Sequence, residues 1–94
     1  MSALHHEQVH ERLKSFEGWH SIGNAIERTF DRGDFSGSIH FVNAVAAAAN
    51  AADHHPDLTV SWNRVTVTLS SHDAGGVTER DFALATAIDA LAAA

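Results

Sequence analysis

The stretch Leu58-Thr59-Val60-Ser61-Trp62-Asn63-Arg64-Val65-Thr66-Val67-Thr68-Leu69 decides the fold. Apolar residues alternate with threonine or serine through both halves, which is the pattern of half-buried β-strands. Only Asn63-Arg64 separates the halves, so we predict a hairpin with a two-residue loop flanked by Trp62 and Val65. The pairs that this register predicts are apolar on both strands: Val60 with Val67, and Leu58 with Leu69.

The mouth of this hairpin carries histidines on both sides. Asp53-His54-His55-Pro56-Asp57 precedes the first strand, and Ser71-His72-Asp73 follows the second. Continuing the predicted register sets His55 opposite His72. Pro56 cannot donate a ladder hydrogen bond, so proximity rather than strict opposition is predicted there. We therefore expect the histidine cluster, defined as His54, His55 and His72, to converge at one end of the sheet.

The spacing of apolar residues outside the hairpin predicts three helices and two further strands. Residues 2–16 should form a helix capped by Ser2 and ended by Gly18, with strands following at 19–22 and 25–32. Ile26 and Phe30 share one face of the second strand. This order, α-β-β-α-β-β-α, predicts an α+β fold in which a four-stranded antiparallel sheet has helices packed on one face.

The two later helices have recognisable starts. Asp34 or Ser36 can cap the central helix, and Thr78 with Asp81 gives the capping-box pattern of the last one. Their predicted apolar stripes are Phe35, Ile39, Val42, Val45, Ala46 and Ala49 in the central helix, and Leu84, Ile88 and Leu91 in the last.

Composition excludes several classes of function. The 94 residues suit one domain, residues 1–94, and six lysines and arginines stand against twelve aspartates and glutamates. Such a chain lacks a basic face, so direct nucleic-acid binding is disfavoured. The absence of cysteine excludes disulfides, thiolate catalysis and iron–sulfur sites. No apolar run reaches the roughly 20 residues of a membrane helix and no secretory signal is visible, so we expect a cytoplasmic protein without a membrane partner.

Eight histidines are the chemically active feature of this composition, because histidine exchanges protons near neutral pH. The cluster could hold zinc, form a merely polar hairpin mouth, or perform acid–base chemistry on a bound small molecule. Adjacent histidines project in different directions, which disfavours a metal. Three consecutive residues, Ser71-His72-Asp73, cannot stack into a catalytic triad. Acid–base chemistry is therefore the favoured interpretation. The other histidines are expected at solvated or structural positions: His5, His6, His10, His20 and His40.

Three segments together resemble the signature of the pterin-4a-carbinolamine dehydratases. They are Asp53-His54-His55-Pro56-Asp57, Trp62-Asn63-Arg64-Val65, and the segment from His72 through Thr78 to Asp81. Nine residues lie between Trp62 and His72, and eight lie between His72 and Asp81. The resemblance extends from Gly18 to Ile88 and includes Ile26, Phe30, Asp34-Phe35 and Val45-Ala46.

The resemblance implies a lyase that dehydrates 4a-hydroxytetrahydropterin to the quinonoid dihydropterin, within tetrahydrobiopterin recycling. It implies a cofactor-free enzyme without a metal, and neither flavin nor nicotinamide is needed because the reaction involves no redox change. His54 and His72 are expected to exchange protons with the reacting centre, while His55 holds the departing hydroxyl. The residues implied to bind the pterin are His54, His55, Pro56, Ser71, His72, Asp73 and Ala74.

Two positions qualify the resemblance. Asp81 belongs to the family pattern, but capping explains it sufficiently, so a structural role is expected. Asn50 stands where the family usually has an acidic residue, lysine or histidine, and an uncharged amide there predicts lower turnover if that residue tunes a histidine. The family also implies homodimers or homotetramers joined through sheet edges. A non-catalytic assembly or transcription-coactivator-type interaction module of the same fold remains the alternative.

Overall fold

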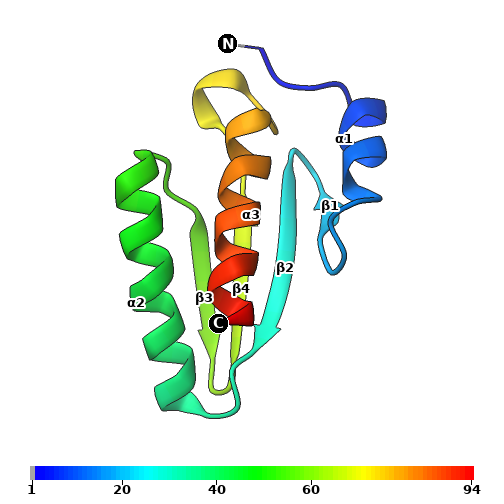
Figure 1. Cartoon of the computed structure of the whole chain (residues 1–94). Helices are drawn as coiled ribbons and strands as arrows, with labels where there is room; N and C mark the ends of the chain where they lie inside the picture. Colours follow the sequence, from blue (N-terminus) through cyan, green and yellow to red (C-terminus); the bar gives the residue numbers. More distant parts are fainter. Residues whose placement is uncertain (1) are drawn as a thin grey trace.

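The computed structural model describes residues 2–94. Its elements are α1 (His6–Leu13), β1 (His20–Ile22), β2 (Ala25–Asp31), α2 (Phe35–Ala52), β3 (Asp57–Ser61), β4 (Arg64–Leu69), the 3₁₀ turn η1 (His72–Ala74) and α3 (Glu79–Ala93). The strands form one antiparallel sheet in the order β1-β2-β4-β3. Helices α2 and α3 lie side by side on one face of this sheet, and α1 packs beside β1 (Figure 1). The predicted α+β class and element order are confirmed.

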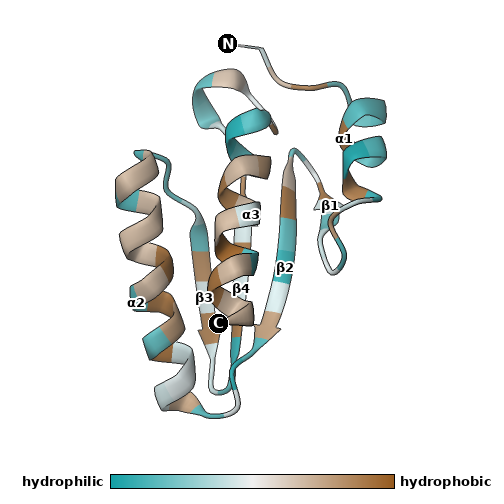
Figure 2. Cartoon of the chain, in the orientation of Figure 1, coloured by the Kyte–Doolittle hydropathy of each residue, from teal (hydrophilic) through white to brown (hydrophobic). Residues whose placement is uncertain are grey.

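The core lies between the sheet and the two long helices. Strand β2 carries both hydrophobic and hydrophilic segments (Figure 2), and the predicted inward pair Ile26 and Phe30 is buried on either side of three polar residues. The opposite face of the sheet is polar, with the hydroxyls of Thr29 and Thr66 2.8 Å apart across β2 and β4. The buried apolar residues of β4 and α3 complete this core: Val65, Val67, Leu69, Phe82, Leu84, Ala85 and Ile88.

The hairpin prediction was right in topology and wrong in register. Strand β3 ends at Ser61 and β4 begins at Arg64, so the two loop residues are Trp62 and Asn63. The observed pairs are shifted by two residues from those predicted: Leu58 faces Val67, and Val60 faces Val65. An even shift returns every side chain to the same face, so both registers pair apolar residues with apolar residues. The conformation of the turn therefore determines the register. Trp62 takes a left-handed backbone (φ 48°), which is uncommon for a bulky residue and was not expected from the sequence.

Helix α1 is shorter than the predicted helix over residues 2–16. It starts after His5, whose backbone N–H donates to Gln8 Oε1 at 2.9 Å, so Ser2 is not its cap. Leu4 donates its backbone N–H to Val77 O at 2.8 Å, which ties the segment just before the helix to the segment after η1. The helix ends at Leu13, well before Gly18.

Helix α2 buries only the later part of the predicted stripe, which includes Val45 and Ala49. Its buried side chains are Ser38, Phe41, Val45 and Ala49. Phe35 and Ile39, from the predicted stripe, are exposed instead. The Ser38 hydroxyl makes this rotation possible, because it donates to Trp62 O at 2.6 Å and can therefore be buried. No helix in residues 2–94 has both the length and the apolarity needed to cross a membrane.

The starts of both long helices are as predicted. Asp34 Oδ1 accepts from Gly37 N at 2.7 Å, which makes Asp34 rather than Ser36 the N-cap of α2. Thr78 and Asp81 form the reciprocal capping box of α3. The second of these starts is also where the candidate site is built.

Candidate active site

His54 lies just beyond α2, where the chain turns back toward the sheet. Asp53 ends the helix in a left-handed conformation (φ 49°), and His54 N donates to Ala49 O at 3.1 Å. Aspartate tolerates this conformation better than most residues. His54 follows the turn with only 8% of its surface exposed, so it is the buried member of the histidine cluster.

The partner of His54 is the carboxylate of Asp81, which is fully buried at the start of α3. His54 Nε2 lies 2.5 Å from Asp81 Oδ1. The second oxygen, Oδ2, accepts from Ser71 Oγ at 2.9 Å and from Thr78 N at 2.9 Å. The hydroxyls of Ser71 and Thr78 are 2.8 Å apart, so the network is closed by side chains on both sides of the β4–α3 connection.

This network fixes which nitrogen of His54 carries a proton. An ionised carboxylate can only accept hydrogen bonds, so Nε2 is the donor toward Asp81. The neutral ring then keeps a lone pair on Nδ1. A histidine whose donor nitrogen is held by a carboxylate has the arrangement in which the other nitrogen acts as a general base.

His55 differs from His54 in being exposed. Its Nε2 lies 3.0 Å from Asn50 Oδ1, one helical turn earlier in α2. Asn50, the position that departs from the family pattern, therefore contacts the second histidine of the doublet and not the first. Its amide oxygen can orient the ring without contributing a charge.

His72 begins η1 and is exposed, and none of the described side chains hydrogen-bonds to it. Its neighbour Asp73 is bound by Arg80, whose Nη2 lies 2.6 Å from Asp73 Oδ1. This hydrogen bond from the guanidinium lowers the pKa of Asp73 below the ordinary carboxyl value. Asp73 is thus ionised at neutral pH and remains so into the acidic range.

The register that set His55 opposite His72 is not the observed one. The β3–β4 ladder ends at Asp57 and Thr68, before it reaches any histidine. If the observed register were continued, Ser71 would come opposite His54. These two residues do meet indirectly, because both hydrogen-bond to Asp81. The start of α3 is therefore the element that brings the two loops together.

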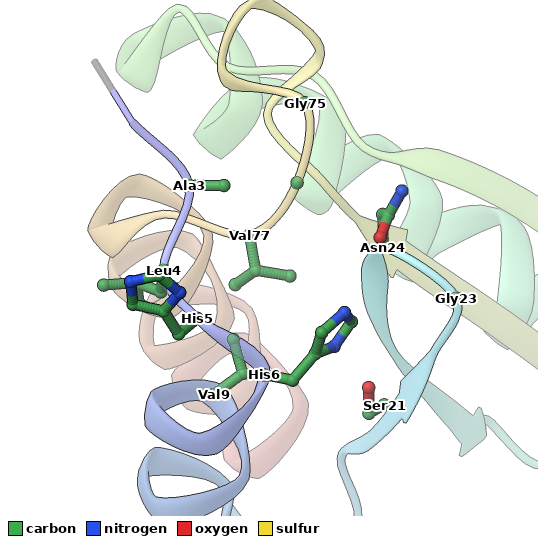
Figure 3. A pocket seen from close by; sticks show the side chains of 11 residues that line it. Ala3, Leu4, His5, His6, Val9, Ser21, Gly23, Asn24, Gly75 and Val77 are labelled. Atoms are coloured by element: carbon green, nitrogen blue, oxygen red, sulfur yellow. The ribbon is translucent and has the colours of Figure 1, made fainter.

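Two cavities lie near these residues. His54 and Arg80 line a groove of about 540 Å³ between α2 and α3, whose other walls are apolar. A separate cavity of about 250 Å³ lies between α1, the β1–β2 turn and the segment after η1 (Figure 3). His5 and His6 line that second cavity, and none of the predicted site residues does. Within residues 2–94, no three histidine or acidic side chains form a group able to hold a metal ion.

The site contacts of two residues in this region were not predicted from the sequence. Asp81 was expected to be only a helix cap, but one carboxylate oxygen caps α3 while the other binds His54. A capping box is a local pattern that explains the hydrogen bond of only one carboxylate oxygen. It gives no information about a long-range partner of the other oxygen. Arg80 received no role, because a lone arginine on a helix carries no motif.

A family model described as "Pterin 4 alpha carbinolamine dehydratase" matches residues 2–91. A Thermosynechococcus vestitus protein named "Putative pterin-4-alpha-carbinolamine dehydratase" is 49% identical over 84 residues, covering 89% of this chain and 88% of that one. A Sulfurisphaera tokodaii protein with the same name is 42% identical and covers 97% and 98%.

Two solved structures are similar to this fold. The crystal structure of a transcriptional coactivator/pterin dehydratase from Brucella melitensis superposes with a TM-score of 0.91 at 36% identity, covering 97% of this chain and 99% of that one. A pterin dehydratase-like protein described as a RuBisCO assembly factor in the alpha-carboxysome has a TM-score of 0.69 at 26% identity, covering 81% and 90%.

Proposed function

Since this chain belongs to the pterin-4a-carbinolamine dehydratase family, we propose that it removes water from a 4a-hydroxytetrahydropterin by histidine acid–base catalysis. The carbon–oxygen bond at C4a breaks, and the hydroxyl leaves as water after it accepts a proton. The adjacent ring nitrogen supplies the electron pair of the new carbon–nitrogen double bond and loses its own proton. The reaction is redox-neutral, so it requires neither a nicotinamide nor a flavin.

The observation that carries this proposal is the buried pair of His54 and Asp81. With its Nε2 proton directed at Asp81, His54 would accept the substrate proton at Nδ1, and the carboxylate would stabilise the imidazolium that results. His72 would donate the proton to the departing hydroxyl. His55, oriented by Asn50, would hold that hydroxyl.

Pterin binding in this proposal involves the loops that flank the histidines. Backbone groups of Pro56 and of the segment from Ser71 to Ala74 would contact the ring. In that arrangement the planar substrate would lie between the α2–β3 connection and the β4–α3 connection. Both connections hydrogen-bond to Asp81 at the start of α3, through His54 and Ser71, which would keep the distance between the two proton-transfer residues fixed.

The decisive experiment generates the 4a-carbinolamine in situ and follows its decay spectroscopically with and without the protein. We expect the protein to accelerate decay, and we expect treatment with a chelator to leave the rate unchanged, because no step needs a metal. A folded protein that does not accelerate decay would favour the second candidate, a non-catalytic interaction module. That candidate is motivated by the similar proteins described as a coactivator/dehydratase and as an assembly factor.

We also propose that the protein forms homo-oligomers through the edge strand β3. Val60 and Trp62 of this hairpin are exposed, and so are Phe35 and Ile39 at the start of α2. The hydrogen bond from Ser38 to Trp62 O holds the first turns of α2 against the hairpin loop, so the proposed interface would include exposed apolar residues of both elements. An edge strand beside an exposed apolar surface suits a second copy of the same chain, since a two-fold interface is self-complementary.

We predict that Val60→Lys together with Trp62→Lys converts the oligomer to a monomer, as measured by analytical ultracentrifugation. Lysine on an edge strand opposes strand pairing. The matched control is Ile22→Lys, because Ile22 is an exposed apolar residue on the opposite edge strand, β1. Dissociation by the control and not by the double variant would place the interface at β1 and contradict the proposal.

A further inference from the structure

The turn η1 carries His72 on a short loop that is anchored at its base, where Ser71 and Gly76 exchange backbone hydrogen bonds and the Ser71 hydroxyl donates to Asp81. None of its three residues is buried. Its own hydrogen bonds are short-range: Ala74 N donates to Ser71 O at 3.1 Å, and Gly75 N donates to His72 O at 3.2 Å. A single 3₁₀ turn has poor hydrogen-bond geometry and little intrinsic stability. With the base of the loop fixed, the orientation of the exposed turn that carries His72 depends on what ties the turn's own residues to the rest of the protein.

Arg80 supplies that tie. Among the described residues, the hydrogen bond from Arg80 Nη2 to Asp73 Oδ1 is the one side-chain bond that joins η1 to another element. Arg80 is itself well placed, because it lies in the first turn of α3 and its backbone N–H donates to Thr78 Oγ1 at 3.2 Å. Its Nε is buried and has no hydrogen-bond partner, so the guanidinium is directed to Asp73 through its outer nitrogen.

The next residue along the helix, Asp81, binds His54. Two consecutive residues of α3 thus contact the two loops that carry the histidines of the proposed proton transfers. Asp81 acts on His54 directly, and Arg80 acts on the neighbour of His72. A helical turn is a rigid support, so the spacing between the two loops is set by one element.

We propose that Arg80 is a positioning residue, which holds His72 in its working place through the ion pair with Asp73. This inference rests on the proposed dehydratase function, because it assigns His72 a proton-transfer role. The guanidinium also lowers the pKa of Asp73. A carboxylate with a lowered pKa in the folded protein loses its contribution only as the pH falls through that lowered value. The ion pair is therefore present throughout the range in which histidine ordinarily titrates.

The test compares Arg80→Met and Asp73→Asn with the wild-type protein. We expect either substitution to lower kcat by about 10- to 100-fold, since small displacements of a catalytic group reduce rates on that scale. We expect Tm to change little, because partly exposed ion pairs contribute little to stability. The double variant should be no slower than the slower single variant, since both changes remove the same contact. Arg80→Lys should restore part of the rate.

A neighbouring ion pair provides a matched control. Arg12 and Glu79 are 2.5 Å apart with side-chain exposures of 41% and 66%, against 37% and 67% for Arg80 and Asp73. Glu79 also lies in the first turn of α3, but its partner is on α1. Arg12→Met and Glu79→Gln should leave kcat unchanged. Equal losses of kcat in the control variants would assign the effect to the helix and would overturn the inference.

Amide hydrogen exchange gives a readout that does not depend on activity. The N–H groups of Ala74 and Gly75, which close η1, should exchange faster in Arg80→Met and at the wild-type rate in Arg12→Met. Unchanged exchange in Arg80→Met would show that Arg80 does not order the turn, and would overturn the inference whatever the rates. A wild-type protein without dehydratase activity would overturn the proposed function and the role of Arg80 in catalysis, while the exchange data would still show whether Arg80 orders η1.

Discussion

His72→Ala is expected to lower the rate of carbinolamine dehydration by about 10²- to 10⁴-fold, the range typical of one lost proton-transfer group. The fold should not be affected, because the His72 side chain is exposed and hydrogen-bonds to none of the described side chains. The measurement is kcat from the spectroscopic decay of the carbinolamine, together with Tm of the same preparation. A large loss of rate at constant Tm is the expected combination.

The matched control for this variant is His40→Ala. His40 is another exposed histidine, on α2, and it belongs to no part of the proposed site. Its replacement should leave both kcat and Tm unchanged. A His72→Ala protein that retains more than about half of the wild-type rate would remove His72 from the mechanism.

Two substitutions of Asp81 should separate its effect on stability from its effect on activity, because alanine removes both side-chain oxygens and asparagine keeps one. Asp81→Ala removes the acceptor for three donors inside the protein, from His54, Ser71 and Thr78. Breaking a buried pair of this kind typically costs about 3–5 kcal/mol of unfolding free energy. Denaturant unfolding should show this loss. Ser71→Ala, which removes one donor to the carboxylate and the acceptor of the Thr78 hydroxyl, should cost less, about 1–3 kcal/mol.

Asp81→Asn should instead preserve most of the stability and still lose activity. The amide oxygen can accept from Ser71 and from the Thr78 N–H, so the cap of α3 is kept. The amide nitrogen then faces His54 and requires Nε2 to be an acceptor, which moves the ring proton to Nδ1. We expect kcat to fall by about 10²- to 10⁴-fold with most of the folding free energy retained, because the tautomer is wrong for a base at Nδ1. Wild-type turnover by Asp81→Asn would show that the His54 tautomer is irrelevant to the reaction.

The class and order of the fold could be predicted because they depend on periodicity alone. Two examples are the spacing of Ile26 and Phe30 and the capping pattern of Thr78 and Asp81. Each predicts a local structure that is present in the fold. The hairpin register could not be predicted in this way, because a shift of two residues preserves every apolar pairing. The actual loop is held by contacts from elsewhere: Trp62 O accepts from Ser38, and Asn63 O accepts from Arg32 N at 2.7 Å.

The candidate site shows the same division between local and distant causes. The histidines, Asp73 and Ser71 could be named from the sequence, and the expectation that the loops meet follows from the hairpin. The bonds that order them could not be predicted: the partner of His54 is 27 residues away, and the partners of His55 and Asp73 are nearer in the chain but belong to no recognisable motif. His54 and Asp81 meet across the β3–β4 hairpin, and the capping role of Asp81 concealed this contact. The exposure of Phe35 was likewise unpredictable, since it required a serine to occupy the buried face of α2.

Strand β4 lies between β2 and β3, although the ribosome makes it after both. While a nascent chain is being synthesised, β2 and β3 have no partner strand between them, and their backbone edges stay open until β4 emerges. Such non-local pairings form slowly and leave exposed edges while they wait. The first turn of α3 is made later still. A chain truncated between His72 and that turn would therefore possess every histidine and yet lack the residues that bind His54 and Asp73, so the candidate site is completed only in the last stage of biosynthesis.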